Sequence, residues 1–294
     1  MSRRSRWTAL LLALVLLLAA AAPALADFRH ARIGARPKAL GSAFVSLVDD
    51  ANAAYWNPAG LTRNDRVSFM ATRAWLYSVP EIYEDYLCLD LNRLGPISVG
   101  ASWVRLGIDG IYSENTVNLA LAARVPRFER LSVGVAGKLF FLEAPGYERY
   151  NDPNYNGGDH DISFDVGLHY DGDGPWTLGA VLYNVTEPEL QLLQNTSKPD
   201  PVYTEWAAGG SYLFRDALLL TVDLRNREGR WADTVAHGGA EIWFFEALAL
   251  RGGIDEGLLT IGAGLQDVHW EVDFCLATHK ELGDVYMISV TVRN

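Results

Sequence analysis

The sequence predicts an all-β protein, a transmembrane up-and-down antiparallel β-barrel of about 14 strands with a small N-terminal plug inside the lumen. Three observations predict this fold. Apolar and polar residues alternate with period two over segments of roughly ten residues, which is typical of membrane barrel strands. No apolar run of roughly 18 residues follows residue 26, so a spanning helix is not expected. The region before the first expected strand is short and rich in Gly and Ala.

Residues 1–26 have the pattern of a secretory signal peptide. Three arginines lie among the first six residues, an apolar run of 14 residues covers 9–22, and Ala24-Leu25-Ala26 offers small residues before a cleavage site. We therefore expect a mature chain that starts at Asp27 and is exported to a bacterial outer membrane. Removing this segment leaves 22 basic against 36 acidic residues, a formal charge of −14. That balance excludes a basic nucleic-acid surface, because binding phosphates takes clustered Lys and Arg.

Residues 27–62 are expected to form the plug. The segment is rich in small residues, and 39–50 could form a short helix or a strand followed by a turn. Asn57-Pro58 predicts a turn, because the residue before proline avoids the helical region. Gly60 allows the chain to bend into the first strand. The candidate plug motif consists of Asp49, Asp50, Asn57, Pro58, Ala59 and Gly60.

The barrel is expected over 63–294. Strands are predicted at 65–76, 83–92, 96–106, 115–124, 131–142, 159–170, 175–185, 203–214, 216–226, 232–245, 246–254, 257–266, 268–278 and 284–293. In the clearest of them Val166 lies on the apolar face, expected to meet lipid, and Asp165 on the polar one. Val272 and Asp273 repeat this relation near the C-terminus. The candidate lumen-facing polar residues are Lys138, Asp161, Asp165, His169, Asp223, Arg225, Arg251, Glu271, Asp273 and Arg293.

The predicted loops alternate in length between the two ends of the barrel. The two longest, 143–158 and 186–202, both follow odd-numbered strands and so lie at one end. Outer-membrane barrels have this asymmetry, with long outer loops and short periplasmic turns. Several Trp residues near strand ends fit interfacial girdles. The alternative that these patterns leave open is a soluble β-sandwich or propeller with Trp in its core.

A lumen of this width would leak unless something fills it. Asp49 and Asp50 are expected to tether the plug by pairing with lumenal cations. The candidate cations are Lys138, Arg225, Arg251 and Arg293.

The sequence offers no metal, phosphate-binding or nucleophile motif. Asp165 and His169, or Glu271 and His269, could be drawn as an acid–base constellation, but lumen-facing residues are polar in any case. We therefore predict no enzyme, no catalytic residue, no metal site and no cofactor. Cys88 and Cys275 fall in strands that are far apart in the predicted order, so two unpaired buried thiols are expected.

The segment GARPKALGSAFVSLVDDANAAYWNPAGL, from Gly34 to Leu61, resembles the N-terminal plug of FadL-type outer-membrane barrels, and more closely that of their PorV/PorQ branch. The hairpin from Val272-Asp273-Phe274 to Glu281-Leu282-Gly283-Asp284 resembles the closing hairpin of the same branch. The chain departs from both groups in its short length and in ending at Asn294, where many barrels end in an aromatic residue.

The resemblance implies two functions. In FadL-type transporters a plug controls the passage of hydrophobic molecules, which leave sideways through a gap in the wall. PorV-type members serve type IX secretion as carriers of exported proteins. The hypotheses are therefore a channel, a secretion accessory barrel and, third, a barrel enzyme. The expected partners are outer-membrane lipid and either small hydrophobic molecules or secreted proteins.

Overall fold

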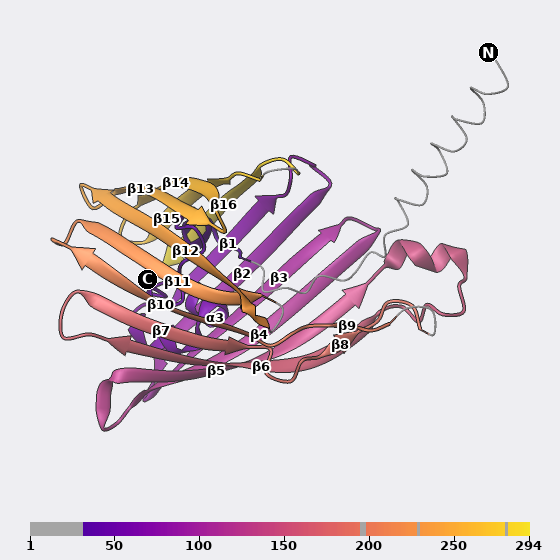
Figure 1. Cartoon of the computed structure of the whole chain (residues 1–294), viewed down its shortest axis with the longest axis horizontal. Coiled ribbons are helices and arrows are strands. Elements are labelled where there is room, and N and C mark those ends of the chain that lie inside the picture. Colours follow the sequence, from indigo (N-terminus) through magenta and orange to yellow (C-terminus); the bar gives the residue numbers. More distant parts are fainter. Residues whose placement is uncertain (1–31, 195–197, 228–229, 280–281) are drawn as a thin grey trace, which may run out of the picture.

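The computed structural model describes residues 32–194, 198–227, 230–279 and 282–294. The predicted signal peptide and its cleavage site lie outside these ranges. Fourteen of the described strands form one closed antiparallel barrel in the order β1-β16-β15-β14-β13-β12-β11-β10-β7-β6-β5-β4-β3-β2 (Figure 1). This is the predicted fold: 14 wall strands, each paired with its neighbours in sequence, and the last strand closed on the first.

The wall strands begin and end within three residues of the predicted positions. They are β1 (Ser68–Trp75), β2 (Ile82–Leu94), β3 (Ile97–Ile108), β4 (Tyr112–Val125), β5 (Phe128–Glu143), β6 (Asp159–Asp171), β7 (Trp176–Tyr183), β10 (Glu205–Phe214), β11 (Leu218–Arg227), β12 (Arg230–Phe244), β13 (Leu248–Asp255), β14 (Leu258–Gln266), β15 (Trp270–Ala277) and β16 (Val285–Arg293).

The alternation of side chains sorts each strand into a lipid-facing and a lumen-facing side. Val166 and Val272 are 38% and 39% exposed on the outside, whereas Asp165 and Asp273 beside them are buried inside. Outward positions of the other strands repeat this with Leu, Ile, Val and Phe. An apolar outer face on a closed sheet suits lipid, because closure leaves no strand edge with unpaired backbone groups.

The barrel closes without a break between its two ends. All eight residues of β1 pair with β16, from Ser68 opposite Arg293 to Trp75 opposite Tyr286. The ending at Asn294 therefore leaves β16 in its predicted place as the closing strand, and the Asn294 side chain accepts a hydrogen bond from the Val67 N–H.

The two long loops lie at the same end, as predicted, and we call it the long-loop end. The β5–β6 loop carries η2 (Pro145–Tyr150), and the β7–β10 loop carries β8 (Glu189–Leu190) and β9 (Asp200–Pro201) (Figure 1). The Gln194 N–H donates to the Asn154 carbonyl and joins the two loops. The two-stranded β8–β9 sheet was not predicted, because two-residue strands show no period. The opposite end, with tight turns, is the short-turn end.

The shortest pairing in the described wall joins β6 and β7. β6 pairs with β7 over six residues only, against twelve with β5. Just after the end of β7 the chain turns at Asn184, which has a φ of 53°. The Val185 N–H still donates a hydrogen bond to the Phe164 carbonyl of β6. By contrast, β3 pairs with β4 continuously over twelve residues.

Residues 32–63 precede the wall and lie within it. They contain α2 (Ala35–Ala39), α3 (Ala53–Trp56) and η1 (Pro58–Arg63). The helix or strand considered for 39–50 is wrong, because only Ala39, the last residue of α2, is helical and turns follow it. Within the described ranges, none of the helices combines the length and apolarity that crossing a membrane takes.

Candidate functional site in the barrel lumen

The N-terminal segment, 32–63, fills the lumen with its own apolar core. Ile33, Leu40, Phe44 and Trp56 are each 0% exposed. Phe44 and Trp56 meet edge to face, with ring centroids 5.9 Å apart, and Trp56 Nε1 donates to the Ile33 carbonyl at 3.0 Å. The segment therefore folds on itself and against the wall rather than crossing the lumen as an extended strand.

A belt of seven inward-facing glycines lets the wall approach this segment. At each of them an added Cβ would lie closer than 3.0 Å to an atom of 39–61, so any other residue would displace the segment or the strand. The sequence carried a signal for this belt, since each glycine stands where its strand points inward. The belt comprises Gly100, Gly134, Gly167, Gly179, Gly239, Gly253 and Gly262.

Asn57 and its neighbours seat the second half of the segment, 51–63. The Asn57 amide donates to the carbonyls of Val45 at 2.9 Å and Leu168 at 3.0 Å, and its oxygen accepts from the Ala59 N–H that begins η1. Pro58 and Ala59 occupy the space above Gly134, and Gly60 lies against Val48. The predicted motif Asn57–Gly60 is thus buried at the contact between the segment and strands β5 and β6.

Asp49 and Asp50 pair with a cation inside their own segment. Arg36 Nη1 donates to Asp49 at 2.6 Å and to Asp50 at 2.9 Å, while Arg36 Nε and Nη2 grip Glu241 of β12 at 3.0 and 3.1 Å. The expected direct pairing with Lys138, Arg225, Arg251 or Arg293 is therefore wrong. Arg36 bridges the two carboxylates to the wall instead, and burial raises the pKa of the Asp50 carboxyl, against the opposing attraction of Arg36.

From Glu241 the charged network extends along the inner face of the wall to neighbouring strands. Arg251 donates to Glu241 at 2.6 Å and to Asp273 at 2.5 Å, and its Nη2 reaches Glu271 at 3.4 Å. Arg293, at the short-turn rim, donates to Glu271 at 3.2 Å. Four of the predicted lumen-facing residues are thus brought into one cluster, together with Arg36 and Glu241, which sequence reasoning missed.

A second ion pair lies on the other side of the lumen. Lys138 pairs with Asp165 at 2.8 Å and donates to the Asn184 side chain at 2.9 Å. Both charged side chains are nearly inaccessible. Lys138 therefore has a carboxylate on the neighbouring strand, and Asn184 ties the chain just after β7 to it.

Asp223 and Arg225 of β11 contact the segment directly. Asp223 accepts the backbone N–H of Val45 at 2.8 Å. The Arg225 guanidinium lies 5.5 Å from the Trp56 ring and 5.2 Å from that of Tyr183, a distance suited to cation–π attraction.

The two remaining candidate lumen-facing residues, His169 and Asp161, differ in how deeply they are buried. His169 is buried, and its Nε2 lies 2.9 Å from the Ser46 carbonyl, which also accepts from the Thr177 hydroxyl at 2.7 Å. Asp161 lies at the long-loop rim, where it accepts from the Glu189 N–H.

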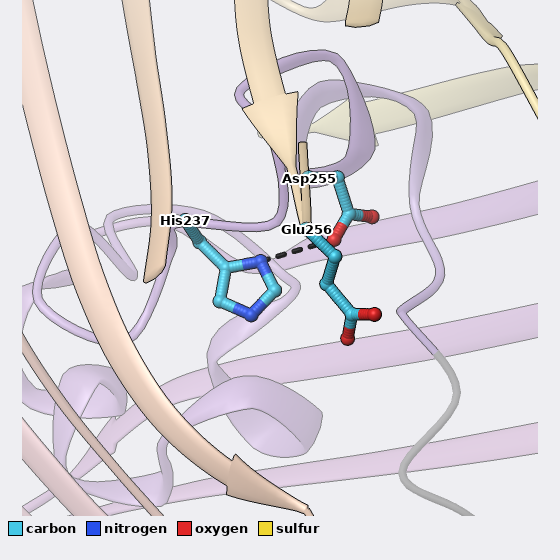
Figure 2. Close-up of side chains that lie close together, drawn as sticks. All are labelled: His237, Asp255 and Glu256. Atoms are coloured by element: carbon cyan, nitrogen blue, oxygen red, sulfur yellow. Dashed lines mark ion pairs between the residues drawn. The ribbon is translucent and has the colours of Figure 1, made fainter. Parts of the chain in front are cut away.

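Asp255, at the end of β13, holds the start of the segment. It accepts from Lys38 at 2.5 Å, from Ser42 at 2.9 Å and from Arg32 at 2.5 Å, and His237 Nδ1 lies 3.0 Å from it (Figure 2). Ligand atoms of His237, Asp255 and Glu256 lie within 4.8 Å of one another, a spacing that could suit a divalent ion. Arg32 also pairs with Glu256, so both carboxylates already have cationic partners in the chain and we assign the cluster to fastening.

A cavity of about 520 Å³ opens at the short-turn end, beneath residues 47–50. Its lining includes Arg36 and Asp49 from the segment and Trp176, Leu219 and Trp243 from the wall. Arg36 therefore belongs both to the charged network that fastens the segment and to the lining of this cavity.

Comparisons with known proteins place the fold. No family model matches the chain, and no curated protein matches its sequence. Among solved structures, the CymD monoaromatic hydrocarbon channel is 14% identical, with a TM-score of 0.58 over 89% of this chain and 96% of that one. The Pseudomonas putida toluene transporter TodX is 12% identical, with a TM-score of 0.57 over 89% and 97%.

A Pseudomonas aeruginosa FadL homologue is 12% identical, with a TM-score of 0.53 over 86% of this chain and 96% of that one. The chain thus shares the 14-strand barrel fold of FadL/TodX-type channels. At these identities the likeness concerns the fold, and the assignment to the PorV/PorQ branch gains no support from any family model.

Proposed function

We propose that the chain is an outer-membrane channel of FadL type, closed by residues 27–62 as a plug, through which small hydrophobic molecules pass. The short-turn end then faces the periplasm and the long-loop end the exterior. The solved structures of similar fold are described as channels or transporters of monoaromatic hydrocarbons and toluene, which supports transport as the use of this barrel.

The observation that carries the proposal is the way the segment is held. Besides its apolar packing on the wall, its buried contacts include the ion pairs Arg36–Glu241 and Lys38–Asp255, at positions where further apolar contacts would hold it more permanently. Buried ion pairs have a large desolvation cost, and apolar replacements are often as stable or more so. Charged contacts can be exchanged for water when the lumen is wetted, which suits a plug that has to be displaced.

A hollow at the long-loop end supports hydrophobic cargo. About 900 Å³ in volume, it lies between the β3–β4 turn and the β5–β6 loop. Its lining includes Ile111, Tyr112, Tyr147 and Tyr150. Aromatic side chains with polar tips suit the capture of apolar molecules from water. No observation in the described part of the chain favours the secretion-accessory hypothesis over this one.

The test is deletion of residues 27–62 together with an uptake assay. Intact cells that express the protein should take up the neutral dye N-phenyl-1-naphthylamine faster than cells with an empty vector. In planar bilayers the full chain should be nearly silent, whereas the deletion variant should conduct steadily, because an emptied polar lumen fills with water. Heat-modified mobility on gels reports whether the deletion barrel is folded. A folded deletion variant as silent as the full chain, or an uptake rate equal to that of the empty vector, contradicts the proposal.

A further inference from the structure

We propose that the cavity at the short-turn end is a binding chamber for uncharged apolar molecules that have passed the plug, and that Arg36 holds its roof closed. The roof is the stretch 47–50, which we call the roof loop. This inference rests on the proposed function and adds to it a site, a class of ligand and a point of control.

The size and lining of the cavity suit a small organic molecule. Its volume of about 520 Å³ lies within the range of roughly 300–1,000 Å³ that is usual for such sites. The indole ring of Trp243 and several aliphatic side chains supply an apolar surface. The aliphatic residues are Leu47, Pro175, Leu213 and Leu219.

The indole of Trp243 is fixed by the charged network beside it. Its Nε1 donates to Glu241 at 3.1 Å, and the Arg251 guanidinium lies 5.5 Å from its ring. This ring is therefore held in place before a ligand arrives, which lowers the entropy cost of binding.

The charges that line the chamber exclude anions. Five carboxylates face two guanidinium groups there: Asp49, Asp171, Asp216, Glu241 and Glu246 against Arg36 and Arg63. Both guanidinium groups are already engaged, Arg36 with three carboxylates and Arg63 with Asp171 at 3.3 Å and with the Leu47 carbonyl. An anionic molecule would meet an acidic surplus with no free cation, whereas a neutral apolar molecule meets the Trp243 ring and the aliphatic side chains.

The roof loop separates this chamber from the interior of the plug. Leu47 faces the chamber, and the next residue, Val48, packs against Gly60 within the plug. Arg36 holds Asp49 and Asp50 on one side, and Arg63 donates to the Leu47 carbonyl on the other. Displacing the loop would therefore join the chamber to the lumen, and the Arg36 contacts oppose that movement.

Two matched dyes test the chamber. N-phenyl-1-naphthylamine and 8-anilinonaphthalene-1-sulfonate share the same rings and differ by one sulfonate, and both fluoresce in apolar sites. Purified full-length protein in nanodiscs should enhance the fluorescence of the neutral dye above that of empty nanodiscs at equal lipid, and should do so little with the anion. Binding of both dyes with equal affinity would overturn the assigned class of ligand.

Variants locate the site. Trp243→Ala should weaken binding of the neutral dye about tenfold, as expected for loss of a central aromatic contact. Leu213→Asn, at the rim, keeps the network intact and should weaken binding about threefold. The control Trp270→Ala removes a lipid-facing indole that is 43% exposed and should leave the affinity unchanged. Wild-type affinity in both chamber variants would overturn the site.

Neutralising rim charges tests the exclusion of anions. Asp216→Asn combined with Glu246→Gln removes two carboxylates and should raise the affinity for the sulfonate dye several-fold, with little change for the neutral one. No gain for the anion would contradict the acidic surplus as the cause. Uptake by cells, measured in parallel, separates the two proposals: normal uptake with no binding in the chamber refutes the chamber alone, while absent uptake in the wild type refutes the proposed function.

Discussion

The two halves of the N-terminal segment differ in how far charge fastens them to the wall. The first half, 32–50, packs on four of the belt glycines and adds ion pairs, through Arg32 and Lys38 on Asp255 and Arg36 on Glu241. The second half, 51–63, is held mainly by shape and neutral hydrogen bonds, as in Asn57 with the Leu168 carbonyl. Shape complementarity is lost only when strands move, whereas ion pairs yield to competing ions, protons and water. We therefore expect the first half to be displaced more easily than the second.

The largest effect should come from breaking the charged fastening at its centre. Arg36→Met leaves Asp49 and Asp50 without their shared cation and should lower the free energy of unfolding by about 3–5 kcal/mol, the usual cost of removing one partner of a buried pair. Frequent channel openings in planar bilayers should accompany it. The matched control is Arg73→Met, whose bidentate pair with Asp85 is exposed and should contribute less than ~1 kcal/mol. Equal effects of the two variants would refute the claim that the buried Arg36 contacts hold the first half in place.

The second half, 51–63, should respond to the addition of a single methyl group to the wall, because it is held mainly by shape. Gly134→Ala places a Cβ against the backbone of Pro58 and Ala59, and should cost about 1–3 kcal/mol through overpacking. Gly137, in the same strand, has no atom within 4 Å of the corresponding position. Gly137→Ala should therefore be neutral or slightly stabilising, because alanine restricts the unfolded chain. Thermal unfolding of the two variants in one detergent decides this, and a cost at Gly137 equal to that at Gly134 would count against the belt.

A smaller effect on stability should follow from neutralising Asp50. Because burial raises the pKa of this carboxyl, the folded protein binds its proton more readily than the unfolded chain does. The group therefore costs stability when ionised, and that cost disappears as the pH falls through the folded pKa. Asp50→Asn should raise stability at neutral pH by less than about 1 kcal/mol and flatten the pH dependence just above the ordinary carboxyl range. Unfolding midpoints measured across that range for wild type and variant test the sign.

The smallest change is expected at the cysteines. Cys88 and Cys275 are buried free thiols on β2 and β15, with β1 and β16 between them. Neither should react with a maleimide in the native wild type, and two should react after denaturation without reductant. Cys275 packs with Ala35 and Ala39 of the first half. In the Arg36→Met variant, Cys275 should therefore react with the maleimide faster than Cys88. The reverse order would mean that the second half moves first.

Much of the barrel could be read from local pattern. Alternation with period two is a property of neighbouring residues, so the 14 strands, their lipid-facing sides and the placing of both long loops at one end were all accessible. One part of the site was accessible as well. Glu241 and Arg251 flank a tight turn symmetrically, and the register places them directly opposite each other. A hairpin argument could have paired them.

The choice of partners in the lumen was decided only by the tertiary structure. The sequence singled out Asp49 and Asp50 and four inward cations, but three of these cations pair with a carboxylate on an adjacent strand, as Lys138 does with Asp165. Side chains on neighbouring strands lie about 5 Å apart, nearer than a segment across the lumen. The cation left for the two aspartates was Arg36, because α2 turns it between 49–50 and β12. Alternation assigns a side chain to a face, whereas its partner depends on strand register and on the path of the plug, which no local pattern encodes.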